Sequence, residues 1–324
     1  MRRADMSVDG NETRGRGLIA TVGTFDGVHV GHLHLLGELK CHAGRLGLEP
    51  VAIVLDTHPL QIVRPEGAPP QLSTFDERRT AIESEGVRVV PLRFTAESRT
   101  ATSEEFMRRI HDEMGIKALL VGHDNRFGSD RWNGLEHYRS CGAKIGLEVI
   151  EGSCLPGVSS SAVRKLLAAG NVEEGNRLLG HPYELDGIVV DGAKLGRRLG
   201  FPTANLRPTH AEMLVPGPGV YATCVSADGI GRFMPAMTNI GHRPTVTEGP
   251  STLSIETHIL DFDGDIYGKR MRILFLKRLR DEIRFDSLEA LVAQLHHDAD
   301  EARARLGASI GIEQTETTNR QYKK

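Results

Sequence analysis

Two histidines stand three residues apart in the run GTFDGVHVGH, residues 23–32. The run lies between a short apolar segment and a helix-like stretch, and the free N–H groups at a helix start favour an anion. Gly23 and Gly27 permit tight turns and let a ligand approach the backbone. His29 and His32 could donate hydrogen bonds to a polyphosphate and stabilise charge that develops at phosphorus and on a departing pyrophosphate. No nucleophilic side chain is needed, because a second substrate would supply the attacking oxygen.

A histidine pair at this spacing is ambiguous by itself. It also occurs as a metal site, a surface pair or packed histidines, and we expect the nearby His34 to sit on the helix surface. The preceding strand, the glycines and Asp26 favour the phosphate interpretation. A second run, SSSAVRKLL at residues 159–167, carries hydroxyl groups and the guanidinium of Arg164, which can grip phosphate oxygens bidentately. That run could equally be a capped surface helix.

The run GRRLGFPTANL, residues 196–206, points to a second phosphate chemistry. Thr203 and Asn205 are two residues apart, so in extended chain their oxygens point to one side. Neutral oxygens suit Mg²⁺, which shares its coordination sphere with phosphates and waters. Residues that would let a nucleotide approach the backbone, or pair with its phosphates, are Gly192, Lys194, Gly196 and Gly200. Taken alone, PTAN could also be a proline turn followed by polar caps.

Glu256 lies in a predicted strand with apolar neighbours. A carboxylate there can accept the proton of a substrate hydroxyl during phosphoryl transfer. An exposed glutamate on a barrel strand is the alternative. Asp261, Asp263 and Asp265 resemble a calcium loop but lack the later glutamate, so we expect a solvated acidic turn.

The segments that must position these residues fall into two kinds. From Leu18 to about Gly170, short apolar runs alternate with helix-like stretches, a pattern that predicts a doubly wound parallel sheet covered on both faces. Ligands in such sheets bind beyond the carboxyl ends of the strands. From Tyr183, glycine-punctuated strands follow one another without long helices, which predicts a small antiparallel barrel or sandwich closed by an amphipathic helix at 287–306. We predict a flexible tail at 1–17, an α/β domain at 18–181, a β-barrel domain at 182–308 and a polar tail at 309–324.

Composition limits the partners of the chain. Its 324 residues suffice for two domains, and a net charge of -3 gives no basic excess for holding nucleic acid. No apolar run approaches the roughly 20 residues of a membrane span, and no apolar segment follows the N-terminal arginines as in a signal peptide. The four cysteines show no metal-ligand spacing. We therefore expect a cytoplasmic protein that binds neither nucleic acid nor membrane, as a monomer or weak homo-oligomer.

The first run is similar to the HxGH signature of the nucleotidylyl transferase superfamily. Its longer form resembles the FAD synthetase module of bacterial bifunctional riboflavin kinase/FAD synthetases. LDTHP at 55–59 is similar to that family's TFDPHP, GHDNRFG at 122–128 to GxDFRFG, and the serine run to SSTxIR. The resemblance implies catalytic roles for His29, His32 and Arg164. It implies nucleotide-binding roles for Gly23, Thr24, Phe25, Asp26, Gly27, Ser159 and Ser160. It implies flavin-binding roles for Asp56, His58, Asp124, Asn125 and Arg126.

The chain departs from the family pattern at four positions. Thr57 replaces a proline, Asn125 a phenylalanine, Ser161 a threonine and Val163 an isoleucine. Asn125 is the largest change, because it puts an amide in place of an aromatic ring beside the expected adenine or flavin site. It bears on substrate preference more than on the reaction.

The second run resembles the riboflavin kinase signature GRxLGFPTANL. The segment IETHILDFDGDIYGKR at 255–270 is similar to that family's vEvHLlDFdgDLYG, and residues 238–245 and 279–287 also match it. The resemblance implies that Glu256 is the catalytic base. It also implies Thr203 and Asn205 as metal ligands and Pro202 as part of the nucleotide site. Arg280 and Phe285 would belong to a loop that closes over the flavin.

These observations predict a bifunctional enzyme. Riboflavin and ATP would give FMN in the barrel, and FMN and ATP would give FAD and pyrophosphate in the α/β domain, with Mg²⁺ in both steps. Two alternatives stay open: an enzyme with one surviving activity, and a flavin- or nucleotide-binding sensor without turnover.

Overall fold

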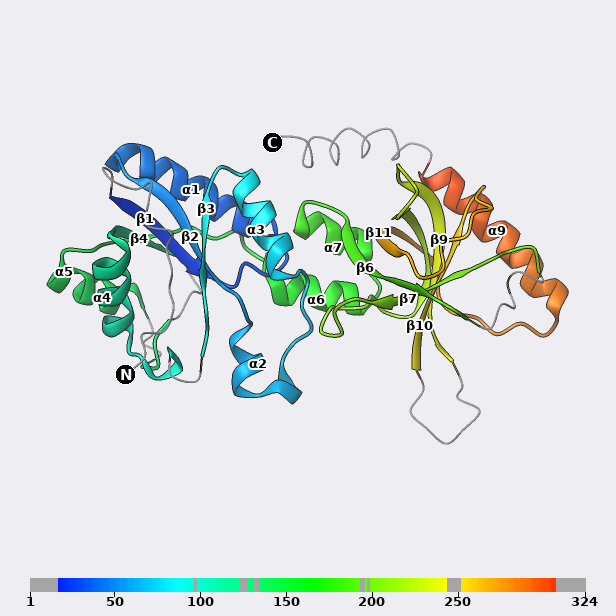
Figure 1. Cartoon of the computed structure of the whole chain (residues 1–324), viewed down its shortest axis with the longest axis horizontal. Helices are drawn as coiled ribbons and strands as arrows, with labels where there is room; N and C mark the ends of the chain where they lie inside the picture. The colour runs from blue at the N-terminus through cyan, green and yellow to red at the C-terminus, as the bar shows by residue number, and fades with distance from the viewer. Residues whose placement is uncertain are drawn as a thin grey trace. The chain divides into compact units, whose positions relative to one another are not determined.

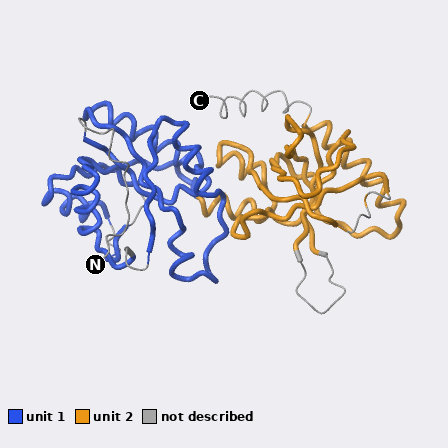
Figure 2. The backbone as a smooth tube through the Cα atoms, in the orientation of Figure 1, with its two compact units in different colours: residues 1–159 blue, residues 160–324 orange. Residues whose placement is uncertain are grey.

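The computed structural model describes residues 17–95, 98–122, 127–130, 134–192, 196, 199–243 and 252–306. Its backbone divides into two compact units, residues 1–159 and residues 160–324 (Figure 2). Among the described residues, no helix is both long enough and apolar enough to cross a membrane.

Five parallel strands form the sheet of the first unit, in the order β3-β2-β1-β4-β5 (Figure 1). The strands are β1 (Leu18–Gly23), β2 (Glu49–Leu55), β3 (Arg88–Leu92), β4 (Ile116–Val121) and β5 (Glu148–Glu151). The chain runs outward from β1 to β3 and then returns to the other side of β1 as β4. A topological switch point therefore lies between β1 and β4, where such sheets bind their ligands.

Helices cover both faces of this sheet. They are α1 (Val30–Leu46) and α3 (Phe75–Ser84) on one face, and α4 (Ser103–Met114) and α5 (Leu135–Ile145) on the other. Ile19 of β1 packs with Leu36 of α1 and Ile82 of α3, and all three side chains are fully buried. The neighbouring residue Ala20 faces the opposite cluster, with Ile110 of α4. The doubly wound α/β fold predicted from the alternating segments is confirmed.

Ser103 stands at the start of α4 and has a residue type that suits an N-cap, but it does not cap the helix. The N-cap is Thr102, whose side chain accepts a hydrogen bond from the Glu105 N–H while Glu105 accepts from the Thr102 N–H. Ser103 is the first helical residue, and its hydroxyl donates to Asp130 at 2.6 Å. The short helix α2 (Pro59–Val63) was also not foreseen, because five residues are too few to show helical periodicity.

A closed antiparallel barrel forms the second unit, with strand order β10-β7-β6-β11-β8-β9. Its strands are β6 (Tyr183–Val190), β7 (Ala204–Pro208), β8 (Gly219–Ala227), β9 (Met234–Arg243), β10 (Thr252–Ile259) and β11 (Arg270–Arg280). The sequence left a barrel and a sandwich as alternatives, and the barrel is correct. The short strand β7 was not predicted as an element. It pairs with β6 and β10 and so joins the two ends of the sheet.

Aromatic rings fill the barrel interior, and a helix covers its outside. Phe275 meets Tyr221 edge-on at 5.5 Å between ring centroids, and both rings are fully buried. The outer cover is α9 (Leu288–Leu306), the predicted closing helix, whose Ala299 and Ala302 pack on outward residues such as Cys224 of β8. The barrel is therefore held by one core inside and a second one under α9.

The helices α6 (Ser160–Ala168) and α7 (Val172–Leu179) belong to the second unit. We expected the domain boundary after residue 181, whereas the compact units divide after Ser159. The reason is packing: Asn176 of α7 donates to the Phe275 carbonyl at 2.7 Å and accepts from the Tyr183 N–H at 2.8 Å. These bonds fasten α7 to β11 and β6.

Candidate active sites

The histidine run takes up the strand–loop–helix arrangement expected of it. β1 ends at Gly23, the loop spans residues 24–29, and α1 begins at Val30 with His29 as its N-cap. The His29 Nδ1 atom accepts a hydrogen bond from the His32 backbone N–H at 3.3 Å. Because Nδ1 is an acceptor, a neutral His29 ring carries its proton on Nε2, which is then a donor.

The two histidine rings are stacked. Their centroids lie 3.6 Å apart with 13° between the planes, and the Phe25 ring lies 5.0 Å from that of His32. Burial lowers the pKa of His32 well below its ordinary value of 6.5, and the charges of His29 and Arg78 lower it further. The His32 Nδ1 atom is enclosed and has no hydrogen-bond partner among the described residues. His32 is thus neutral near pH 7, and its ring carries one N–H group that can donate to a bound anion.

Asp26 and Phe25 hold the loop from inside. Asp26 is 3% exposed, and its carboxylate accepts from the N–H groups of Leu72 and Ser73 at 3.0 Å and from the Ser73 hydroxyl at 3.3 Å. The Ser73 oxygen in turn accepts from the Gly27 N–H at 2.7 Å. Side chains predicted to bind nucleotide therefore shape this loop, and the groups that remain near a ligand are the histidines and the backbone.

Two residues of the predicted flavin site lie at the end of β2. Asp56 follows the strand, and one of its carboxylate oxygens accepts from the Phe94 N–H at 3.4 Å. His58 caps α2, with its Nδ1 accepting from the Leu60 N–H at 3.2 Å. β1 and β2 are parallel neighbours, so their carboxyl ends bring this segment to the same edge as the histidines. The remaining predicted flavin residues of this unit, Asp124, Asn125 and Arg126, lie outside the described residues.

The predicted phosphate-binding serines straddle the two units. Ser159 is the last residue of the first unit, and Ser160 begins α6 in the second, which also carries Arg164. The helix predicted for this run is present. The roles of these three residues stay predictions.

In the barrel unit, Glu256 faces two asparagines across neighbouring strands. Glu256 of β10 is directly opposite Asn205 of β7 on one side and Asn239 of β9 on the other. Directly opposite residues share a face of the sheet. The next residue, Thr257, points to the other face and is fully buried in the barrel with Thr223 and Thr238. An amide, a carboxylate and a second amide therefore form a row on the outer face of the barrel.

The glycines around PTAN bring backbone close to this row. A Cβ on Gly192 would overlap the Asn205 side-chain amide, and a Cβ on Gly196 would overlap the Phe201 carbonyl. Gly200 has a φ of 80°, which glycine adopts without strain. His258 Nδ1 lies 2.8 Å from the Pro202 carbonyl oxygen and donates to it, which fixes the segment before Thr203. The predicted phosphate partner Lys194 lies outside the described residues.

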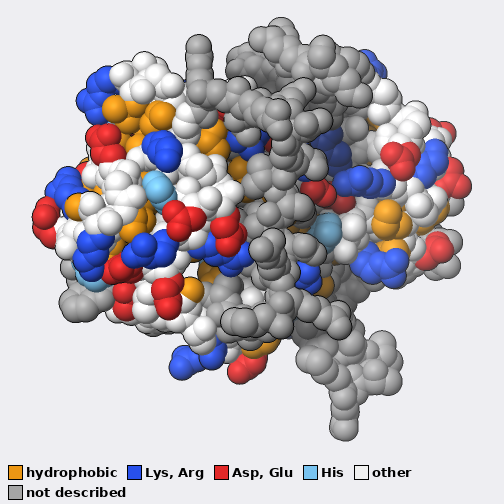
Figure 3. All heavy atoms as spheres, turned by 60° about the vertical axis from the view of Figure 1, so that its left-hand side comes forward, with side chains coloured by type: hydrophobic (Ala, Val, Ile, Leu, Met, Phe, Trp, Pro, Cys, Tyr) orange, Lys and Arg blue, Asp and Glu red, His pale blue; other side chains and the backbone are white. Residues whose placement is uncertain are grey.

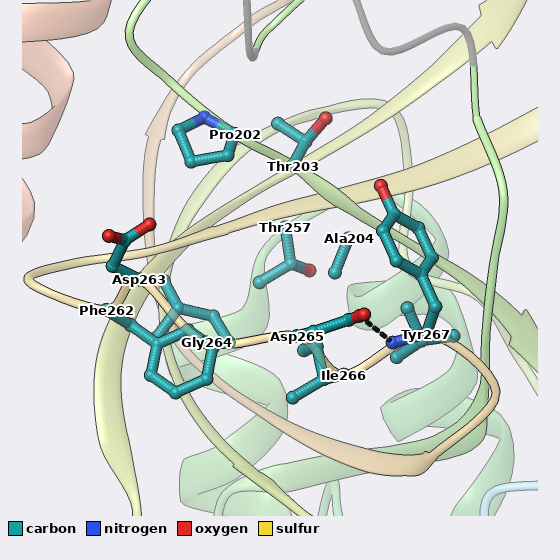
Figure 4. A pocket seen from close by; sticks show the side chains of 12 residues that line it. Pro202, Thr203, Ala204, Thr257, Phe262, Asp263, Gly264, Asp265, Ile266 and Tyr267 are labelled. Carbon is teal, nitrogen blue, oxygen red and sulfur yellow. Dashed lines mark hydrogen bonds between the residues drawn. The ribbon is translucent and has the colours of Figure 1, made fainter.

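A cavity of about 600 Å³ opens beside this segment. Figure 4 shows Pro202 and Thr203 at one side of it, with Phe262, Asp263, Asp265 and Tyr267 across from them. Asp265 accepts from the Tyr267 N–H at 3.0 Å, so the acidic segment forms a tight turn that walls the cavity. Thr257 and Ala204 line its inner side, at the mouth of the barrel.

Arg280 ends β11 and is tied to α9. Its guanidinium donates to both carboxylate oxygens of Asp298, at 3.0 and 2.7 Å, and lies 5.9 Å from the centroid of the Phe285 ring. Asp298 is only 1% exposed and also accepts from Gln294 at 2.8 Å. In this state Arg280 fastens the segment that carries Phe285. A flavin-binding role for either residue stays a prediction.

Sequence reasoning missed several residues that these sites depend on. They are Arg78, Ser73, Asn239, His258 and Asp298. Asn239 and His258 stood inside segments that matched the family, and a strand register would have placed Asn239 beside Glu256. No local pattern distinguishes Arg78 from Arg79, because only the fold buries one of them.

The described side chains on the face viewed in Figure 3 form no large patch of one charge sign. Acidic and basic side chains alternate there among the described residues. This distribution agrees with the small net charge of -3.

Fold and sites together define a two-unit transferase that handles nucleotide phosphates in two different ways. A riboflavin kinase family model matches residues 179–306, and an FAD synthetase family model matches residues 11–157. The chain belongs to the family of bifunctional riboflavin kinase/FMN adenylyltransferases.

Similar proteins span nearly the same length. The chain is 40% identical over 295 residues to a bifunctional riboflavin kinase/FMN adenylyltransferase of Pseudomonas fluorescens, covering 89% of this chain and 93% of that protein. It is 36% identical over 298 residues to the Escherichia coli K12 protein of the same name, covering 90% and 93%. A crystal structure from Streptococcus pneumoniae, described as a macrolide-efflux protein, is 30% identical with a TM-score of 0.80, covering 90% of this chain and 96% of that one.

Proposed function

We propose that the chain makes FAD from riboflavin in two ATP-dependent steps, one in each unit. The barrel unit would transfer the γ-phosphoryl group of ATP to riboflavin, and the α/β unit would transfer the adenylyl group of a second ATP to FMN. The observation that carries the proposal is the pairing of Glu256 with Asn205. It puts a carboxylate, which can accept a proton, next to an amide oxygen, which can bind a metal ion, on the neighbouring strand.

In the kinase step, Glu256 acts as the general base. Its carboxylate accepts the proton of the terminal ribityl hydroxyl as that oxygen bonds to the γ-phosphorus and the bond to ADP breaks. The cavity beside Pro202 and Thr203 is our candidate for the nucleotide, because residues of the predicted nucleotide segment line it together with the aromatic rings of Phe262 and Tyr267. Gly192, Gly196 and Gly200 would let the chain approach the phosphates.

Mg²⁺ belongs to this proposal. The Thr203 hydroxyl and the Asn205 amide are neutral oxygen donors of the kind Mg²⁺ accepts when phosphates and waters complete its sphere. Gly192 fits this arrangement, since only a residue without a Cβ leaves room for the Asn205 amide. When bound, Mg²⁺ would neutralise charge on the transferred phosphoryl oxygens.

In the adenylylation step, an FMN phosphate oxygen attacks the α-phosphorus of ATP and pyrophosphate leaves. His29 and His32 donate hydrogen bonds to the phosphate oxygens on which charge develops, aided by the N–H groups at the start of α1. Ser159, which ends this unit, would contact the departing pyrophosphate, and Asp56 and His58 would contact the flavin. A cytoplasmic location and a monomeric or weakly associating state remain predictions.

The purified chain incubated with riboflavin and MgATP tests the proposal. Chromatography should show FMN first and then FAD, with ADP and pyrophosphate formed in step with them. FMN and MgATP without riboflavin should yield FAD and pyrophosphate but no ADP. Riboflavin that is bound but unconverted would instead indicate a sensor, and conversion that stops at FMN would indicate a single surviving activity.

A further inference from the structure

Arg78 of α3 is a cation buried under the histidine loop. The residue is 2% exposed, and its guanidinium donates to four backbone carbonyl oxygens. A buried charge is costly unless hydrogen bonds compensate it, and four carbonyl dipoles do so here. Burial lowers the pKa of Arg78, while the carboxylates of Asp26, Asp56 and Glu77 oppose that shift. The guanidinium still stays charged at neutral pH, because the pKa of an arginine lies far above it.

The four carbonyls belong to three separate segments of the candidate adenylyl-transfer site. Thr24 follows β1 in the histidine loop, Leu55 and Asp56 end β2, and Thr74 starts α3. The Leu55 and Asp56 oxygens lie 3.1 and 3.2 Å from the guanidinium nitrogens. One planar side chain therefore sets the spacing between the loop that carries the histidines and the segment that carries the predicted flavin contacts.

The histidine loop needs such support. Phe25 and Val28 have φ angles of 52° and 39°, a left-handed conformation that is costly for residues with a Cβ. Asp26 anchors the middle of the loop to Leu72 and Ser73, just before α3. Arg78 anchors its beginning from the helix itself. Without the guanidinium, the carbonyl groups of Thr24, Leu55 and Asp56 would lose this donor.

We propose that Arg78 is a positioning residue of the adenylyl-transfer site, which fixes the histidine loop relative to the end of β2 and supplies a permanent positive charge behind the two rings. This inference rests on the adenylyltransferase function proposed above. Arg78 acts through the loop and through its field, and does not itself contact the substrates.

The charge has a consequence that a purely structural residue would lack. It adds to burial and to the charge of His29 in lowering the pKa of His32. A neutral side chain at position 78 would relieve part of that effect and raise the pKa of His32. In this proposal the free chain binds ATP productively only when His32 is neutral. The acid limb of the pH profile for adenylylation should then move to higher pH.

Two substitutions separate geometry from charge. Arg78→Lys keeps the charge, but a single ammonium cannot span three segments. We expect kcat for FMN adenylylation to fall roughly 100-fold, as a displacement of about 1 Å can cause, with an unchanged acid limb. Arg78→Gln should lower kcat at least as much, and it should also move the acid limb of the pH profile of kcat/KM to higher pH. Arg79→Lys is the matched control, since Arg79 is 56% exposed and pairs with Glu83 one turn away.

Riboflavin kinase activity of the same chain is the internal reference, and it should stay within about twofold in all three variants. A wild-type chain that cannot adenylylate FMN would refute the proposed function itself. If the wild type is active and Arg78→Lys matches it in kcat, the positioning role is wrong. Equal losses of both activities in Arg78→Lys would reduce Arg78 to a folding residue and would also overturn the proposal. So would an acid limb that does not move in Arg78→Gln.

Discussion

The two candidate sites are built from different parts of their folds. In the α/β unit the candidate catalytic histidines stand at the loop and first helical turn beyond the end of β1, and buried hydrogen bonds of Asp26 and Arg78 fix that loop. In the barrel unit Glu256 and Asn205 stand within strands, and the hydrogen-bonded register fixes them. The difference teaches where each site is vulnerable. The strand site fails when its chemical groups change, whereas the loop site also fails when its supports change.

Replacing the proposed base, Glu256, should give the largest effect. Glu256→Gln keeps the shape of the side chain but cannot take up a proton, so FMN formation should fall roughly 10²- to 10⁴-fold. Conversion of FMN to FAD should stay within about twofold, because it uses the other unit. Separate steady-state assays with riboflavin and with FMN measure the two effects.

The control for that variant is Glu289→Gln, at an exposed position in the first turn of α9. It should leave both activities unchanged. If Glu256→Gln stays folded yet loses both activities, the assignment of one reaction to each unit is wrong.

The reciprocal change should give the next largest effect. His29→Ala combined with His32→Ala removes the ring donors, and FAD formation should fall roughly 10²- to 10³-fold while FMN formation continues. FMN should then accumulate in a riboflavin assay. His34→Ala is the matched control. His34 lies on the same helix, but its ring forms a hydrogen bond of 2.7 Å with Ser153 and does not belong to the stacked pair. Continued FAD synthesis by the double variant would remove the histidines from the mechanism.

Much of this comparison was accessible from the sequence. Alternation of apolar runs and helices predicts the parallel sheet, and the glycine-punctuated strands predict the barrel, because both patterns are local. His29, His32 and Glu256 were singled out as candidates because each lies where a motif coincides with a predicted element, and their roles stay predictions. The cross-strand partner Asn239 was not found, since register depends on how β9 and β10 meet. The burial of Arg78 and Asp298 depends on tertiary packing, which their neighbours in sequence do not reveal.

Removing the charge of Asp298 tests whether the buried pair of Asp298 and Arg280 contributes to the stability of the barrel unit. Asp298→Asn weakens the bidentate pair with Arg280 and leaves a cation with a poorer partner, at an expected cost of about 3 kcal/mol in the free energy of unfolding of the barrel unit. Thermal inactivation should therefore reach the kinase activity at a lower temperature than in the wild type, while the adenylylation activity keeps its profile. Asp300→Asn is the control, because Asp300 is 80% exposed in its pair with Arg303. Equal inactivation temperatures for Asp298→Asn and Asp300→Asn would contradict the structural role of the buried pair.

The smallest expected effect is a pH dependence of the barrel that comes from His258. Burial lowers the pKa of His258 below its ordinary value of 6.5, and the charge of Arg303 lowers it, while the hydrogen bond to Pro202 and the charge of Asp261 oppose the shift. Above pH 6.5 the ring is neutral in both folded and unfolded chains, so its contribution to stability is fully present. As the pH falls below 6.5, the unfolded chain takes up the proton first and the barrel loses stability.

His258→Asn removes this titration while its side-chain amide can still donate to the Pro202 carbonyl. The denaturant midpoint of this variant should therefore decrease less than that of the wild type between pH 7 and pH 5. The difference between the two decreases should be smaller than the loss of stability caused by Asp298→Asn. His42→Asn, at a half-buried position on α1 of the other unit, should follow the wild type. An identical pH dependence in all three chains would mean that His258 titrates alike in the folded and unfolded states. A buried neutral imidazole would then not stabilise the barrel site. In that respect the barrel site would differ from the histidine site of the α/β unit, which contains the buried neutral His32.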